Sequence, residues 1–134
     1  MNWSVCLTDK VKDNKLTKVW PQLLETQFSS EDETVELSFF VPQDLDYFTG
    51  HFPNAPILAG VVQLHWAVEY AKEQFSFNHK DVQNLEVLKF KAVIVPGQNL
   101  QLVLTKKSEE KIIFSYSSDK GQHASGRIVF EAKP

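Results

Sequence analysis

The sequence is poor in cysteine and has no long apolar run. Cys6 is the single cysteine among the 134 residues, so an intrachain disulfide and a cysteine-based zinc site are both excluded. No stretch reaches the roughly 18 apolar residues that a membrane-spanning helix needs. The first residues lack the basic start and apolar run of a signal peptide. We therefore expect a cytoplasmic protein without a membrane span.

Basic charge and recognisable phosphate-binding motifs are lacking as well. The formal net charge is −3, whereas nucleic-acid binding usually needs a broad basic surface. No Gly-rich phosphate loop and no serine-nucleophile motif is found. His51, His65 and His79 recur at intervals of fourteen, but they fall in a loop, a helix and a turn. We expect no nucleic-acid partner and no bound metal ion.

The chain has enough apolar residues for one packed core. Hydrophobic residues make up 43% of the sequence, and ten of its residues are phenylalanine. A chain of this length is long enough for one domain and short for two. We expect a single domain over residues 1–134, with the polar residues 1–20 as a candidate N-terminal arm.

Periodicity predicts one helix among several strands. Val35, Leu37 and Phe39 alternate with more polar neighbours, which is typical of a half-buried strand. Residues 61–75 are apolar nearly all round, which indicates a buried helix. The order predicts an α+β fold, in which the helix lies in the concavity of a five- to six-stranded antiparallel sheet with open edges that favour homodimer pairing. Strands are expected at 23–30, 34–41, 82–95, 99–107, 111–118 and 122–132.

The loop before the helix carries a histidine suited to proton transfer. His51 follows Gly50, and Pro53 and Pro56 stiffen the segment after it. An imidazole with a pKa near ~6.5 exchanges protons around neutral pH. His51 is therefore a candidate catalytic base. The alternative is a structural histidine that is hydrogen-bonded to a backbone carbonyl.

Two positions in the helix are further candidates. Gly60 stands at the helix start, where unpaired N–H groups and the helix dipole can bind the oxygen of an acyl group. His65 lies five residues further in an apolar surface, where a polar group needs a partner or a ligand. The alternatives are a loop hinge at Gly60 and a core histidine with a satisfied hydrogen bond at His65.

The motif around His51 resembles a known enzyme family. Gly50-His51-Phe52-Pro53, then Pro56 and Gly60-Val61, match the spacing of hot-dog-fold 3-hydroxyacyl-[acyl carrier protein] dehydratases of bacterial fatty-acid synthesis. The sequence LKFKAVIVPGQNLQL is also similar to a strand–turn–strand segment of that family. The resemblance spans residues 20–131 and extends to the dehydratase-like proteins of aryl polyene gene clusters. It implies a hot-dog fold, in which one long buried helix is wrapped by five or six antiparallel strands.

The resemblance implies roles for individual residues. His51 would take the proton beside the thioester carbonyl, and the Gly60 N–H would bind that carbonyl. His65 occupies the position of the family's acidic residue, so it replaces the carboxyl group, only positions substrate, or marks lost catalysis. In such dimers His51 of one subunit faces the position of His65 in the other. The expected substrate contacts are Gly60, Val61, Phe52, Pro53 and Leu64.

The implied reaction needs no cofactor. A carrier-bound (3R)-3-hydroxyacyl thioester would lose water to give the trans-2-enoyl thioester, in fatty-acid or aryl polyene type lipid biosynthesis. The expected partners are an acyl carrier protein and either a second copy, in a homodimer or larger assembly, or a homologous subunit. A non-catalytic subunit that binds acyl chains, or pairs with an active homologue, is one alternative. An acyl thioesterase is another, although no acidic residue lies between Gly60 and Val68.

Several neighbouring side chains receive secondary predictions. Gln63 and Glu69 are candidates to assist the site. Glu69 either holds His65 and raises its pKa, or is a solvated helix residue. His79 and His123 lie in polar segments and are expected to be exposed. A local basic patch near the site is considered for docking of the acidic carrier protein, formed by Lys72, Lys89, Lys91, Lys106, Lys107 and Arg127.

Overall fold

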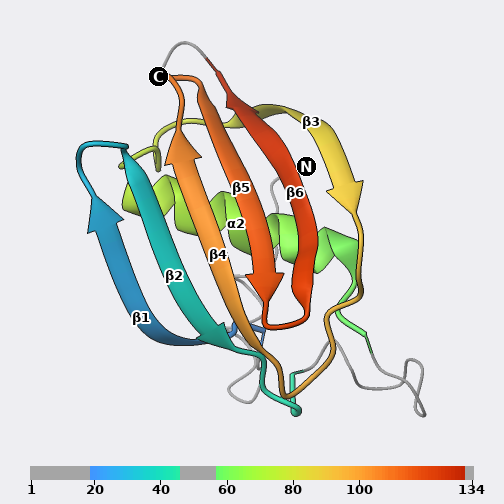
Figure 1. Cartoon of the computed structure of the whole chain (residues 1–134). Coiled ribbons are helices and arrows are strands. Elements are labelled where there is room, and N and C mark those ends of the chain that lie inside the picture. Colours follow the sequence, from blue (N-terminus) through green and yellow to red (C-terminus); the bar gives the residue numbers. More distant parts are fainter. Residues whose placement is uncertain (1–18, 46–56, 132–134) are drawn as a thin grey trace, which may run out of the picture.

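The described residues of this computed structural model, 19–45 and 57–131, form one antiparallel sheet around one helix. The sheet order is β1-β2-β4-β5-β6-β3, and α2 crosses behind its strands (Figure 1). This architecture confirms the predicted α+β class and the strand number. The elements are β1 (Gln22–Ser29), β2 (Thr34–Phe40), α2 (Gly60–Gln74), β3 (Val82–Phe90), β4 (Asn99–Lys106), β5 (Lys111–Ser118) and β6 (Gly121–Phe130).

The central strands bury every second residue against the helix. Leu37 of β2 pairs with Leu102 of β4, which in turn pairs with Tyr116 of β5, and all three are buried. A period of two places such residues on one face of a sheet. The inner face of the sheet and the apolar side of α2 therefore share one core.

Helix α2 lies against this core over most of its surface. Trp66, Ala67 and Ala71 are fully buried, and the indole Nε1 of Trp66 donates a hydrogen bond to the Val19 carbonyl at 3.0 Å. The helix ends where Ser76 adopts a φ of 60° and the Phe77 N–H donates to the Lys72 carbonyl at 2.8 Å. Such a left-handed residue commonly terminates a helix.

Strand β3 is shorter than the sequence predicts. It ends at Phe90 rather than Val95, and its pairing with β6 shifts register twice. Residues 91–95, here called the strap, leave the sheet and hold the segment before α2. The Leu58 N–H donates to the Ile94 carbonyl at 2.7 Å. The strap therefore connects the end of β3 to the start of the helix.

Both edges of the sheet carry exposed apolar side chains. Leu23, Leu24 and Phe28 are exposed on β1, and Val87, Leu88 and Phe90 are exposed on β3. The opposite edges at β1 and β3 are visible at the two sides of the sheet in Figure 1. Open apolar edges of this kind are available for pairing with another chain.

Candidate active site

The predicted site residues divide between the described and undescribed parts of the chain. His51, Phe52 and Pro53 lie in residues 46–56, outside the described residues. Gly60, Val61, Leu64 and His65 all lie in the first two turns of α2. The structure therefore describes the helical half of the predicted site.

Gly60 is the first residue of α2, as the sequence predicts. The N-cap residue Ala59 makes no side-chain cap, and the first turn carries no acidic residue. The N–H groups of Val62 and Gln63 donate to the Ala59 carbonyl at 3.1 and 3.2 Å. The amides at the very start of a helix have no intrahelical partner, so this turn suits the oxygen of a bound acyl group.

A cleft opens beside Gly60, between the helix start and the strap. Its volume is about 370 Å3, and we call it the Gly60 cleft. Val61 is 58% exposed next to it, and Leu64 is partly buried against the core. The roles of Val61 and Leu64 in substrate binding stay predictions. The lining residues are Ile57, Leu58, Ala59, Gly60, Gln63, Phe90, Lys91, Ala92 and Val93.

Gln63 is the buried polar side chain of this cleft. Its Nε2 donates to the Leu58 carbonyl at 3.0 Å, and its Oε1 has no hydrogen-bond partner among the described residues. The Gln63 carbonyl accepts a hydrogen bond from the Tyr116 hydroxyl at 2.8 Å. Burial raises the pKa of Tyr116 well above its usual value, so this hydroxyl keeps its proton. Gln63 thus connects the start of α2 to Leu58 before the helix and to Tyr116 in the sheet.

His65 lies on a different side of α2. At about 100° per residue, five residues turn the helix by about 140° away from Gly60. The imidazole is 2% exposed and packs against Trp20, with ring centroids 5.2 Å apart and the ring planes tilted by 35°. Among the described residues, those that line the Gly60 cleft do not include His65. The expectation that a second subunit completes the site stays a prediction.

The electrostatics at His65 differ from the expectation. Burial lowers the pKa of His65 below its usual value, the carboxylate of Glu69 partly offsets this, and Lys72 adds to the lowering. Glu69 therefore acts in the predicted direction, but the net pKa of His65 is lowered because burial outweighs the carboxylate. Near pH 7 the imidazole of His65 is mainly neutral.

His123 corrects a second expectation. It is 1% exposed, whereas His79 is exposed as predicted. Ala124 of β6 pairs with Tyr116 and Gln122 pairs with Ser117, so His123 is the extra residue of a bulge. A bulge changes which side chains face inward, and here both His123 and Ala124 are buried. A bulge of this kind leaves no clear signal in the sequence.

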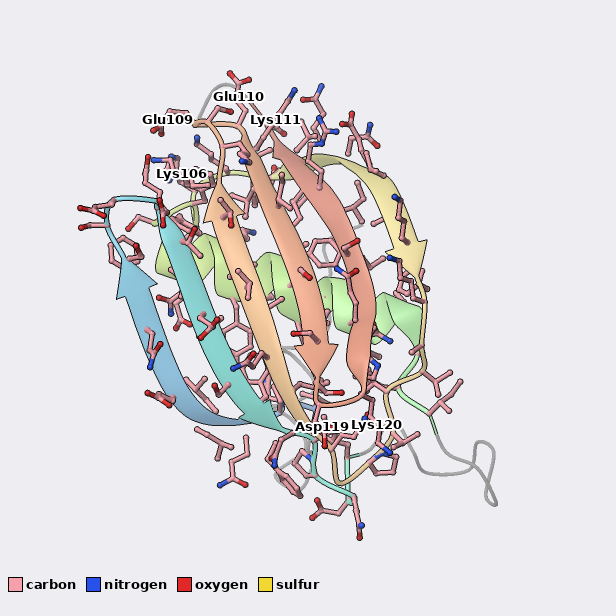
Figure 2. The ribbon with its side chains drawn as sticks, in the orientation of Figure 1. Lys106, Glu109, Glu110, Lys111, Asp119 and Lys120 are labelled. Atoms are coloured by element: carbon pink, nitrogen blue, oxygen red, sulfur yellow. The ribbon has the colours of Figure 1, made fainter. Side chains whose placement is uncertain are left out.

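The basic side chains are distributed over the molecule. Lys106 contacts Glu33 at 3.6 Å and Glu109 at 2.8 Å, and Arg127 contacts Glu86 at 3.7 Å. Figure 2 shows Lys106 and Glu109 at the end of the sheet opposite Lys120. Of the six residues considered for the basic patch, Lys91 lines the Gly60 cleft. Lys106 and Arg127 are paired with carboxylates and therefore offer little to an acidic partner, and a carrier-binding patch stays a prediction.

The described residues show neither a membrane-spanning helix nor a metal-binding cluster. Within residues 19–45 and 57–131, no helix combines the length and apolar character needed to cross a bilayer. The same residues contain no group of three or more His, Cys, Asp or Glu side chains arranged to hold a metal ion.

Comparison with known proteins places this geometry among dehydratases. The family model described as ApeI-like, ApeI dehydratase, matches residues 27–127. The 3-hydroxyacyl-[acyl-carrier-protein] dehydratase FabZ of Streptococcus suis is 32% identical over 106 residues, which cover 73% of each chain. The FabZ of Rhizobium etli is 29% identical over 92 residues, which cover 64% of this chain and 58% of that one.

Two solved structures are similar over most of the chain. An uncharacterised protein from Erwinia carotovora subsp. atroseptica has a TM-score of 0.72 and 33% identity, and the match covers 84% of this chain and 96% of that one. The dehydratase heterocomplex ApeI:P from Xenorhabdus doucetiae has a TM-score of 0.74 and 25% identity, and the match covers 83% of this chain and 97% of that one.

Proposed function

Because this chain belongs to the ApeI-like dehydratase family, we propose that it dehydrates carrier-bound (3R)-3-hydroxyacyl thioesters to trans-2-enoyl thioesters. Its helix and six-stranded antiparallel sheet form the hot-dog fold that the resemblance implies. The observation that carries the proposal is the uncapped start of α2 at Gly60, which borders a cleft. The FabZ relative of Streptococcus suis, named for this reaction, supports the substrate class.

The reaction begins at the thioester carbonyl. The N–H of Gly60 donates to the carbonyl oxygen and stabilises the negative charge that develops there. This makes the proton on C2 more acidic, and the imidazole of His51 removes it. The electron pair of the broken C2–H bond forms the C2–C3 double bond, and the 3-hydroxyl leaves. No cofactor is needed, because the thioester itself stabilises the charge.

The leaving hydroxyl needs a proton to depart as water. His51 carries a proton after it has deprotonated C2, so proton transfer from His51 balances the reaction without a second acid. His65 of a second subunit holds the hydroxyl by a hydrogen bond, which a neutral imidazole can donate. This role agrees with the lowered pKa of His65, since an imidazolium is not required.

The proposed site needs a second chain. The Gly60 cleft and the His65 side chain lie on different sides of α2, and the β3 edge beside the cleft is open and apolar. We propose that a second copy or a homologous subunit pairs with this edge. The Xenorhabdus doucetiae dehydratase, described as a heterocomplex, supports the second arrangement. An acyl carrier protein in the cytoplasm would deliver the substrate, with Lys91 near the cleft as one contact.

A non-catalytic subunit is the second candidate function. It is favoured by one observation: a histidine of lowered pKa occupies the position at which the family has an acidic residue. Such a subunit would bind acyl chains or support an active homologue. A thioesterase is less well supported, because the helix offers no carboxylate between Gly60 and Val68 to direct water.

One assay separates the candidate functions. The purified chain is given 3-hydroxyacyl thioesters of several chain lengths on acyl carrier protein, and both enoyl product and free thiol are measured. Enoyl product without free thiol supports the dehydratase, and free thiol supports the thioesterase. If neither forms, a homologous dehydratase is added. Activity that this chain increases in that mixture supports the non-catalytic subunit.

A further inference from the structure

His123 is hydrogen-bonded to the residues that follow β3, where the chain leaves the sheet. The β3–β6 ladder ends with Phe90 opposite Ala124. Beyond that pair, the His123 carbonyl accepts hydrogen bonds from the Lys91 N–H at 2.8 Å and the Ala92 N–H at 3.3 Å. The main chain of His123 thus holds the first two residues of the strap.

The side chain of His123 holds the same segment a second time. Its Nδ1 lies 3.3 Å from the Ala92 carbonyl, and its Nε2 lies 2.6 Å from the Ser118 hydroxyl. A carbonyl only accepts, so Nδ1 carries a proton and donates to Ala92. The Ser118 hydroxyl accepts the Lys120 N–H at 3.1 Å and gives its own proton to Nε2. Both the N–H and the carbonyl of Ala92 are therefore bonded to His123.

Ala92 lies in the wall of the Gly60 cleft, although His123 does not. Lys91, Ala92 and Val93 face Gly60 and Gln63 across the cleft. The adjoining Phe90 ring is close enough to Gly60 that an added Cβ would lie 3.1 Å from it. Movement of Ala92 therefore changes the width of the cleft at the helix start.

We propose that His123 is a positioning residue: through its paired hydrogen bonds to Ala92, it sets the distance between the strap and the start of α2. The inference rests on the proposed function, because that distance places the acyl thioester against the Gly60 N–H. His123 itself does not contact the substrate. A displacement of about 1 Å at such a distance from the chemistry can reduce turnover about a hundredfold.

Two variants of similar side-chain shape provide the test. His123→Asn keeps an N–H donor close to the place of Nδ1, and His123→Leu has nearly the same shape without a donor. Both lose the ring, so their difference reports the hydrogen bond rather than the lost volume. Amide hydrogen exchange at Lys91, Ala92 and Val93 is measured together with kcat and KM, and the thermal unfolding midpoint corrects for global stability. The exposed His79→Leu is the control.

The Leu variant should exchange the Ala92 amide at least about ten times faster than the unchanged chain. Its kcat/KM should fall about tenfold or more, while the Asn variant stays within about threefold of the unchanged chain. Equal behaviour of the Asn and Leu variants would overturn the proposal, and so would unchanged exchange at Ala92 in both. If the Leu variant does not fold, Ser118→Ala replaces it, and unchanged exchange at Ala92 again overturns the proposal.

Failure of the proposed function is recognised separately. If the unchanged chain forms no enoyl product, the dehydratase assignment fails whatever His123 does. The two variants are then compared by their affinity for a 3-hydroxyacyl carrier thioester. Tighter binding by the Asn variant supports the positioning role, and equal affinity overturns it.

Discussion

The ring of Phe90 lies against Gly60 at the start of α2. A Cβ added at Gly60 would lie 3.1 Å from two atoms of that ring. Phe90 is the last residue of β3, so this contact joins the edge of the sheet to the proposed oxygen-binding turn. A side chain at residue 60 would displace the ring, and the cleft would change with it.

Gly60→Ala should therefore affect activity more than stability. Alanine favours a helix by about 1 kcal/mol relative to glycine, which offsets part of the contact with Phe90. We expect the free energy of unfolding to change by less than about 1 kcal/mol, while kcat/KM falls about tenfold or more. Denaturation in urea and steady-state kinetics measure the two quantities. Adding Phe90→Ala should restore part of the activity, and no recovery would contradict the role of this contact.

Gly126→Ala should reduce stability. A Cβ at Gly126 would lie 2.6 Å from Leu88 Cδ2 and 2.8 Å from Phe114 Cε2. Phe114 is buried, so it cannot move without disturbing the core. Overpacking of this kind costs about 1–3 kcal/mol, measured as the free energy of unfolding in urea. Gly121→Ala would be a poor control because Gly121 has a φ of 113°, so Ser125→Ala in β6 is used. An unchanged midpoint for Gly126→Ala would contradict the packing.

His65 should make stability depend on pH. Because its pKa is lowered in the folded chain, the unfolded chain binds the proton first as the pH falls below about 6.5. The contribution of His65 to stability is thus complete above that pH and is lost below it, down to the lowered pKa. The difference in free energy of unfolding between the unchanged chain and His65→Gln should shrink as the pH falls through this window. If the free energy of unfolding changes with pH equally in both proteins, His65 does not contribute to the pH dependence.

Tyr116→Phe tests the support of the helix start. The variant removes the hydroxyl that donates to the Gln63 carbonyl but keeps the buried ring. A lost hydrogen bond of this kind costs about 0.5–1.5 kcal/mol in the free energy of unfolding. Because Gln63 borders the cleft, we also expect a lower kcat/KM. Tyr70→Phe is the matched control, since Tyr70 is only half-buried and lies near the other end of α2. Equal effects of Tyr116→Phe and Tyr70→Phe on kcat/KM would contradict the role of the Tyr116 hydrogen bond in holding the helix start.

His65→Glu tests the departure from the family pattern. A carboxyl group at this position restores the family's acidic residue. If neutral His65 only holds the departing hydroxyl, we expect kcat to change by less than about tenfold in either direction. A gain from no activity to measurable enoyl formation would instead support the non-catalytic subunit, because the unchanged chain would then lack an essential acid.

The sequence predicts the fold well where periodicity is strong. β2, β4 and β5 follow the predicted ranges closely, because each alternates apolar and polar residues over seven or eight positions. α2 begins within one residue of the prediction, since in the sequence Gly60 separates the apolar run from a proline-rich segment. Strand alternation and the helix start depend on residues that are close in the sequence, so the sequence alone predicts them.

The errors arise where distant residues meet. β3 ends early because the amides of Lys91 and Ala92 bond to the His123 carbonyl and the Ile94 carbonyl accepts from Leu58. His123 is buried because a bulge in β6 turns it inward. The pKa of His65 is lowered because burial beside Trp20 outweighs Glu69. None of these contacts can be read from spacing along the chain. The predicted roles of His51 and of a second subunit stay predictions.

The most direct test of the account is the rate of enoyl formation by the His51→Ala variant. The unchanged chain and the variant are given a 3-hydroxyacyl thioester on acyl carrier protein, with His79→Ala as the control at an exposed histidine. We predict enoyl formation by the unchanged chain and the control, and a loss of at least about a hundredfold in His51→Ala. Equal rates in all three proteins would contradict the proposed chemistry.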